Sequence, residues 1–122
     1  MRRYADVALS IGGKRIDLPG KIKQIICVYE KVIVLIYSDE LTHHTRPHAN
    51  GNIICLDEYG SWLWEVEHRQ PTYDEHPGGA FNPFHKMEVE FTTPPRMNAW
   101  NGDYRVEVDL DTGKWLKTDL TK

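Results

Sequence analysis

The chain has 122 residues, of which 40% are hydrophobic and 27% are charged, with a net charge of -3. This composition excludes a disordered chain, and the net charge argues against a nucleic-acid partner. The longest apolar run, residues 32–37, is far shorter than the roughly 20 residues of a membrane helix, and no apolar signal core follows the N-terminal arginines. We therefore expect a cytoplasmic protein with no membrane partner.

The first predicted element is a hairpin that turns at Gly12-Gly13. Apolar side chains recur at every second position from residue 5 to residue 11, as on a half-buried strand. Two glycines readily take the positive φ values of a two-residue turn. Such a turn places Leu9 opposite Ile16, so the apolar residues of both strands share one face.

Two apolar runs follow, at residues 22–28 and 32–37, and both are rich in β-branched residues. They predict central strands covered on both faces. The pattern stops at long loops, residues 38–50 and 68–85, and such loops are often functional. We expect one all-β domain over residues 1–122, whose mostly antiparallel hairpins form a sandwich or strongly twisted sheet of about eight or nine strands.

Residues 50–64 and 101–116 form an internal repeat. Each copy runs from Asn-Gly through a strand to an acidic turn with Gly, and then to a strand that carries Trp. The turn Asp is expected to accept hydrogen bonds from turn amides, and the later Gly to take a left-handed conformation. In the second copy, the Asn-Gly loop places Ala99 opposite Tyr104. Such units bury their Trp side chains only against stacked neighbours.

The repeat resembles the strand-turn-strand core of a quinoprotein-type β-propeller. The residues that carry the resemblance are Cys55-Leu56-Asp57, Gly60 and Trp64 in the first copy and Asp109, Thr112 and Gly113 in the second, where Lys117 replaces the expected Trp. The run from Ile22 to Trp64 also looks like small bacterial proteins with a single hairpin of this kind. A propeller needs about four blades, and this chain has room for about two. The resemblance therefore implies the hairpin and not the ring, and it implies no quinone.

The two cysteines and the paired acids have ordinary interpretations. Cys27 and Cys55 lie in apolar runs, where a free thiol behaves as a small buried side chain. The acids at residues 65 and 67, and those at residues 88 and 90, share a strand face within each pair. Two carboxylates across a cleft can serve a glycosidase. We favour a solvent-exposed sheet face instead.

Most histidines lie in or beside the two long loops. His43, His44, His48 and His76 are candidate ligands for zinc, copper or nickel, because imidazole commonly binds these ions. They support an alternative function, a metal-dependent hydrolase. Solvated loop histidines are the interpretation that we favour, so we expect no cofactor.

The second loop also carries an aromatic cluster, Tyr73, Phe81 and Phe84, among Pro and Gly residues. Together with Arg46, these side chains are the expected contacts for a ligand, a protein partner or a neighbouring subunit. No nucleophile elbow or phosphate-binding loop is found, and no catalytic residue is assigned. We expect a small binding or protein-interaction domain that is not an enzyme.

The charge is distributed unevenly along the chain. Residues 1–37 carry seven basic and three acidic groups, whereas residues 38–122 carry eight basic and fifteen acidic groups. Surfaces of opposite sign can favour self-association, but we favour the interpretation that the two segments attract each other within one domain. We expect a homo-oligomer, with a neighbouring subunit as the preferred contact of the aromatic cluster in the second loop. A binder that neutralises another protein fits the same acidic profile.

Overall fold

The computed structural model describes residues 8–18, 20–37, 52–67, 84–101 and 104–120, and these contain strands and no helix. The strands are β1 (Ala8–Ile11), β2 (Lys14–Asp17), β3 (Ile22–Val28), β4 (Lys31–Ile36), β5 (Ile53–Asp57), β6 (Trp62–Glu65), β7 (Lys86–Glu90), β8 (Arg96–Asn101), β9 (Tyr104–Val108) and β10 (Trp115–Leu120). The predicted all-β class is confirmed, with ten strands in the described ranges. Nothing there is a helix of the length and apolarity that crossing a membrane requires.

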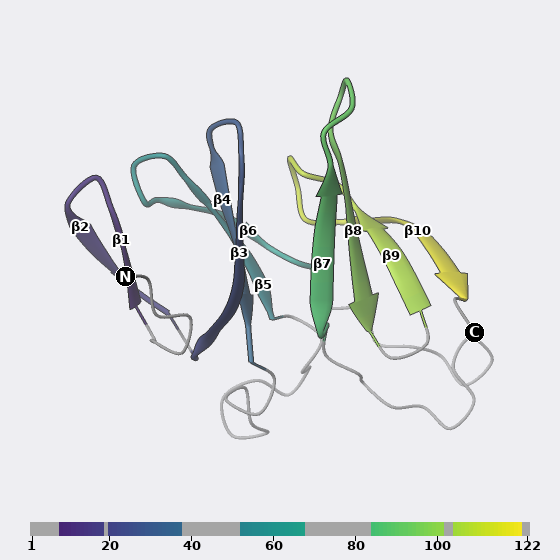
Figure 1. Cartoon of the computed structure of the whole chain (residues 1–122), viewed down its shortest axis with the longest axis horizontal. Coiled ribbons are helices and arrows are strands. Elements are labelled where there is room, and N and C mark those ends of the chain that lie inside the picture. Colours follow the sequence, from purple (N-terminus) through teal and green to yellow (C-terminus); the bar gives the residue numbers. More distant parts are fainter. Residues whose placement is uncertain (1–7, 19, 38–51, 68–83, 102–103, 121–122) are drawn as a thin grey trace.

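The strands form three layers. The β1-β2 hairpin covers one side of a first sheet, β3-β4-β5-β6, and a second sheet, β10-β9-β8-β7, lies on its other side. Figure 1 shows the hairpin at the left, the first sheet in the middle and the second sheet at the right. The expected antiparallel sandwich is confirmed. The turns that connect β1 to β2, β3 to β4, β5 to β6, β7 to β8 and β9 to β10 all lie at the top, which we call the turn end.

Two apolar cores hold these layers together. The core between the sheets contains Val28, Ile33, Leu35, Ile53, Cys55, Trp64, Val66, Phe84, Met87, Met97, Ala99, Val106, Val108 and Trp115. The core beneath the hairpin contains Ile16, Leu18, Ile22, Val34, Ile36, Ile54 and Leu56. Side chains of β4 alternate between the two cores, because successive residues of a strand point to opposite faces. The expectation of a strand covered on both faces is therefore confirmed for β4.

The prediction that residues 22–28 form a central strand was wrong. In the described ranges, β3 lies at the edge of the first sheet, and β5 pairs with the other side of β4. An apolar run shows that both faces of a strand are covered, but it does not show on how many sides the strand is hydrogen-bonded. The second central strand, β5, follows the long connection after β4.

The register of two hairpins was also predicted. Gly12 and Gly13 have φ values of +56° and +81°, and Leu9 pairs with Ile16 as expected. In the second repeat the predicted register was off by two residues, because Ala99 pairs with Val106 instead of Tyr104. The closing pair of β8 and β9 leaves only residues 102 and 103 between the strands. Since side chains alternate with a period of two, the same residues still face the core.

Two polar side chains join the sheets through backbone groups. The Asn52 amide is fully buried; its Nδ2 donates to the carbonyls of Ile36 and Phe84, both at 2.8 Å, and its Oδ1 accepts from the Phe84 N–H at 3.0 Å. Gln24 of β3 pairs in the same way with Met87 of β7, donating to its carbonyl at 2.8 Å and accepting from its N–H at 3.1 Å. Each side chain thus supplies the hydrogen bonds that a neighbouring strand would supply.

The turns of the two repeats have the predicted chemistry. The Asp57 carboxylate accepts two turn amides at 2.9 Å each, and that of Asp109 accepts one at 2.8 Å. Gly60 and Gly113 have φ values of +88° and +77°, the left-handed conformation that glycine adopts most readily.

The copies also pack against each other. The Trp64 indole of the first copy donates to the Leu110 carbonyl of the second at 2.8 Å, and Gly113 lies directly against its ring. Glu67 completes the contact, because its N–H donates to the Gly113 carbonyl and its carboxylate accepts from the Trp115 N–H.

Candidate functional site

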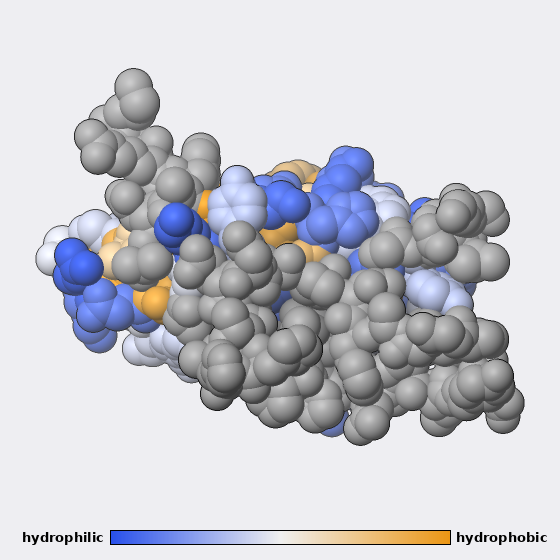
Figure 2. All heavy atoms as spheres, turned by 90° about the horizontal axis from the view of Figure 1, so that it is seen from below, coloured by the Kyte–Doolittle hydropathy of each residue, from blue (hydrophilic) through white to orange (hydrophobic). Residues whose placement is uncertain are grey.

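A groove of about 670 Å³ lies at the turn end of the sandwich. It is lined by the β3-β4 turn, the β7-β8 turn and the β9-β10 turn, with Leu116 of β10 at its side. Loops that a rigid sheet holds in place often form binding sites. Seen from the opposite end, the described residues in view form a mostly hydrophilic surface with small, separate apolar areas (Figure 2).

The floor and rim of the groove differ in polarity. Val28 and Val108 are almost fully buried, and Leu110 packs against the core between the sheets. On the rim, the Tyr29 side chain is 76% exposed, and its backbone has a φ of +53°. The groove therefore combines an apolar floor with a solvent-exposed aromatic ring.

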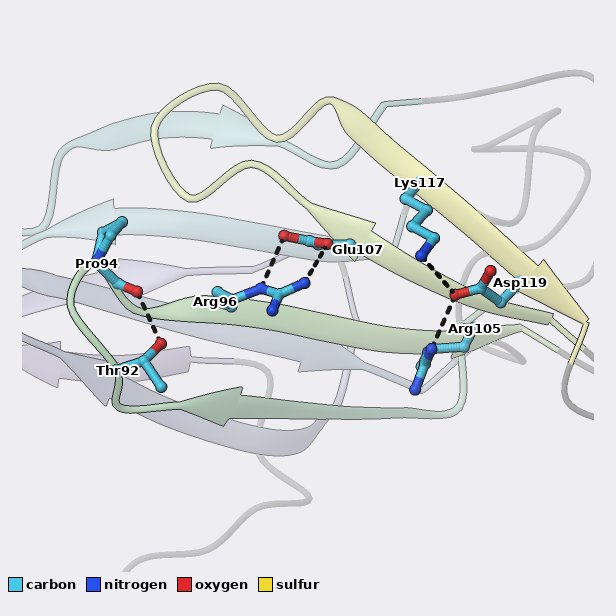
Figure 3. A network of polar contacts seen from close by, with 7 residues as sticks. All are labelled: Thr92, Pro94, Arg96, Arg105, Glu107, Lys117 and Asp119. Atoms are coloured by element: carbon cyan, nitrogen blue, oxygen red, sulfur yellow. Dashed lines mark hydrogen bonds and ion pairs between the residues drawn. The ribbon is translucent and has the colours of Figure 1, made fainter.

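Ion pairs line the groove walls. The Arg96 guanidinium donates to both carboxylate oxygens of Glu107, at 2.9 and 3.2 Å (Figure 3). Through this hydrogen bond Arg96 holds the pKa of Glu107 below its usual value. A second ion pair joins the β3-β4 and β9-β10 turns, with the Lys31 Nζ 3.5 Å from the Asp111 Oδ1. Both charge signs are thus present beside the apolar floor.

The outer face of the second sheet is polar and balanced in charge. Its basic and acidic members are Lys86, Arg96, Arg105 and Lys117, and Glu88, Glu90, Glu107 and Asp119. The Arg105 guanidinium donates a hydrogen bond to the Asp119 carboxylate at 2.8 Å (Figure 3). This hydrogen bond lowers the pKa of the Asp119 carboxyl. The Lys86 ammonium lies over the Trp100 ring at 4.9 Å. Among the described residues, this face is charged and polar, unlike the apolar faces that pack in the two cores.

Only one predicted contact residue falls within the described ranges. The Phe84 side chain is 1% exposed and packs edge-to-face on Trp115, with ring centroids 6.0 Å apart. Phe84 is therefore a core residue and not a surface contact, because its place next to β7 directs the ring between the sheets. The other predicted residues, Tyr73, Phe81, Arg46, His43, His44, His48 and His76, lie outside the described residues.

The metal-dependent hydrolase stays a prediction. Within the described ranges, no three His, Cys, Asp or Glu side chains gather as metal ligands would. The acidic pairs have other contacts: Glu88 pairs with Lys86 at 3.3 Å, and Glu67 accepts the backbone N–H of Trp115 at 2.9 Å.

The two thiols differ. Cys55 is fully buried, as expected, and burial raises its pKa to about 12. Cys27 is exposed, contrary to the expectation, because it lies near the end of an edge strand. The Cys55 thiol therefore stays protonated and unreactive at neutral pH.

Few local patterns in the chain indicate the groove. Thr92-Thr93-Pro94-Pro95 is a turn signal in its own right, because Pro-Pro interrupts a strand pattern. Tyr29 lies between two apolar runs, and nothing in the neighbouring sequence predicts that its side chain is exposed. The meeting of three turns that are distant in the sequence depends on how the two sheets stack.

Fold and groove together define the class of this protein, a two-sheet antiparallel β-sandwich, capped by a hairpin, with a loop-lined groove at one end. The chain belongs to the family described as a domain of unknown function (DUF7957), whose model matches residues 1–120. No curated protein and no solved structure matches the chain.

Proposed function

We propose that this is a non-enzymatic protein-interaction domain that binds an extended segment of a partner protein in the turn-end groove and also associates with itself. The observation that carries the proposal is Tyr29. This aromatic side chain is 76% exposed on the groove rim, in a backbone conformation that disfavours it.

Tyr29 occupies the first position of a two-residue turn between Val28 and Lys31. Gly or Asn would hold a positive φ there at little cost, whereas a bulky side chain costs about 1 kcal/mol or more. Strained residues of this kind occur often at binding sites, where the side chain has a use that offsets its cost. An exposed tyrosine is a typical contact residue at protein interfaces.

The groove chemistry favours a peptide segment. Its volume lies within the usual range of ligand sites. An apolar side chain of the partner would rest on the floor formed by Val28, Val108 and Leu110, and charged neighbours on the partner would meet Arg96 or Asp111 at the walls.

A random-peptide display library, panned against the immobilised protein, tests the proposal. The affinity of an enriched peptide should fall about tenfold or more in Tyr29→Ala, because the variant removes a central aromatic contact. Tyr59→Ala is the matched control, since Tyr59 is 71% exposed on the neighbouring turn and does not line the groove. Equal affinities for both variants and the wild type, or no enriched peptide, would contradict the proposal.

A further inference from the structure

We propose that two copies of the chain pair through the outer edges of β10, antiparallel and centred on Thr118, so that their second sheets join into one continuous sheet. This inference rests on the self-association in the proposed function and names the surface that carries it. It does not depend on the groove.

β10 is the open edge of the second sheet among the described residues. It pairs with β9 on one side and ends the strand order on the other. At the opposite edge of this sheet, the Gln24 side chain already occupies the N–H and carbonyl of Met87. Within the part of the chain that the structure describes, a further strand therefore finds open backbone groups along β10, whereas the backbone groups of Met87 on β7 are occupied.

One hydrogen bond shows toward which neighbouring strand the N–H and carbonyl of each β9 residue point. The Asp109 N–H donates to the Lys114 carbonyl at 2.8 Å, so the backbone of Asp109 faces the β10 side. Successive residues of an antiparallel strand direct their hydrogen-bonding groups to opposite neighbours. Arg105 and Glu107 therefore face β10 as well.

The alternation continues across the register into β10. Lys117 pairs with Glu107, and Asp119 pairs with Arg105. Since these two β9 residues face β10, Lys117 and Asp119 direct their backbone groups back to β9. Thr118 lies between them and directs its N–H and carbonyl outward, where a second copy can pair with them.

The sequence of this edge is complementary to itself. Around Thr118, the segment reads Leu116-Lys117-Thr118-Asp119-Leu120. In a symmetric antiparallel pair centred on Thr118, each Lys117 lies opposite the other copy's Asp119. Cross-strand pairs of opposite charge stabilise such a ladder.

The side chains of Lys117 and Asp119 are available for this pairing. Both belong to the outer face of the sheet, 66% and 35% exposed, with their charged groups 3.9 Å apart (Figure 3). Edge strands that avoid pairing often carry Pro or charges of one sign. This edge carries one charge of each sign, in the order that a two-fold axis through Thr118 makes attractive.

Sedimentation velocity from about 5 to 500 µM, the range in which a short edge interface associates, tests the proposal. The wild type should shift from monomer to dimer. Thr118→Pro should weaken the dimer about tenfold or more, because proline removes the outward N–H in both copies while the hydrogen bonds to β9 remain. Thr118→Ala keeps that N–H and should dimerise like the wild type. A wild-type monomer at every concentration, or an unchanged Thr118→Pro dimer, would overturn the proposal.

A charge exchange keeps the test decisive if Thr118→Pro does not fold. Lys117→Glu and Asp119→Lys each place like charges opposite one another in a homodimer, so each alone should associate more weakly than the wild type. Mixed together, the two variants have opposite charges at both positions and should form a heterodimer. If the mixed variants form no heterodimer, the register centred on Thr118 is excluded. A groove that binds no peptide would leave these outcomes unchanged, so the two proposals fail separately.

Discussion

The contact between the two repeats predicts that equivalent glycines respond differently to alanine. Gly60 and Gly113 hold the same position in their turns, and both have positive φ values. A Cβ at residue 113 would lie 2.5 Å from the Trp64 ring and 3.0 Å from a backbone carbonyl oxygen. At residue 60 it would lie 2.6 Å from the Ile16 Cδ1, the end of a side chain that can rotate away.

The free energy of unfolding separates these cases. The positive φ costs alanine about 1 kcal/mol at either position. Gly113→Ala adds an overlap with an indole held by its hydrogen bond to Leu110, for which overpacking costs about 1 to 3 kcal/mol more. We expect a loss of about 2 to 4 kcal/mol for Gly113→Ala and about 1 kcal/mol for Gly60→Ala, measured by urea unfolding with tryptophan fluorescence. Equal losses would refute the proposed packing of the second turn on Trp64.

Three further predictions concern buried and charged groups. Asn52→Ala should lower the free energy of unfolding by about 3 kcal/mol or more in urea titrations, because three buried backbone groups lose their partner. A loss below about 1 kcal/mol would contradict the role of the Asn52 amide in joining Ile36 to Phe84. Ellman's reagent should titrate Cys27 alone in the native protein and both thiols in urea; fast native reaction of Cys55 would contradict its burial. Because the pKa of Glu107 is lowered on folding, its ion pair stabilises the protein above the unfolded pKa of about 4.3 and is lost as the pH falls through the folded value. Glu107→Gln should remove this dependence of stability on acid pH. The ion pair contributes less than about 1 kcal/mol to the free energy of unfolding, because Arg96 is exposed to solvent. If stability changes with pH equally in the variant and the wild type, the ion pair does not stabilise the fold.

Local patterns predicted the parts of the fold that depend on neighbouring residues. The turn at Gly12-Gly13 and the Asp-to-Gly turns of both repeats follow from backbone preferences that a few residues determine. Strand order was harder, because β3 and β4 have similar apolar runs and only long-range pairing makes one an edge. The register of β8 and β9 was off by two residues, a shift that side-chain alternation cannot detect.

The groove required information that no single segment contains. Tyr29, Pro94 and Leu110 come from three turns far apart in the chain, and only the stacking of the sheets brings them together. Phe84 shows the converse, because its aromatic ring in a Pro-rich stretch resembles a contact residue, yet Asn52 fixes its backbone at the edge of the core. An aromatic side chain can be a surface contact or a core residue, and only its burial in the fold distinguishes the two.

Locating the peptide-binding surface tests the proposed function most directly. A peptide enriched by library panning would be titrated into the isotope-labelled protein, and amide chemical shifts followed by nuclear magnetic resonance. We predict that the largest shifts fall on Tyr29, Thr93 and Leu110, the three turns of the groove. Shifts confined to the charged outer face of the second sheet, or to the β1-β2 hairpin, would contradict the assignment of the groove as the binding site.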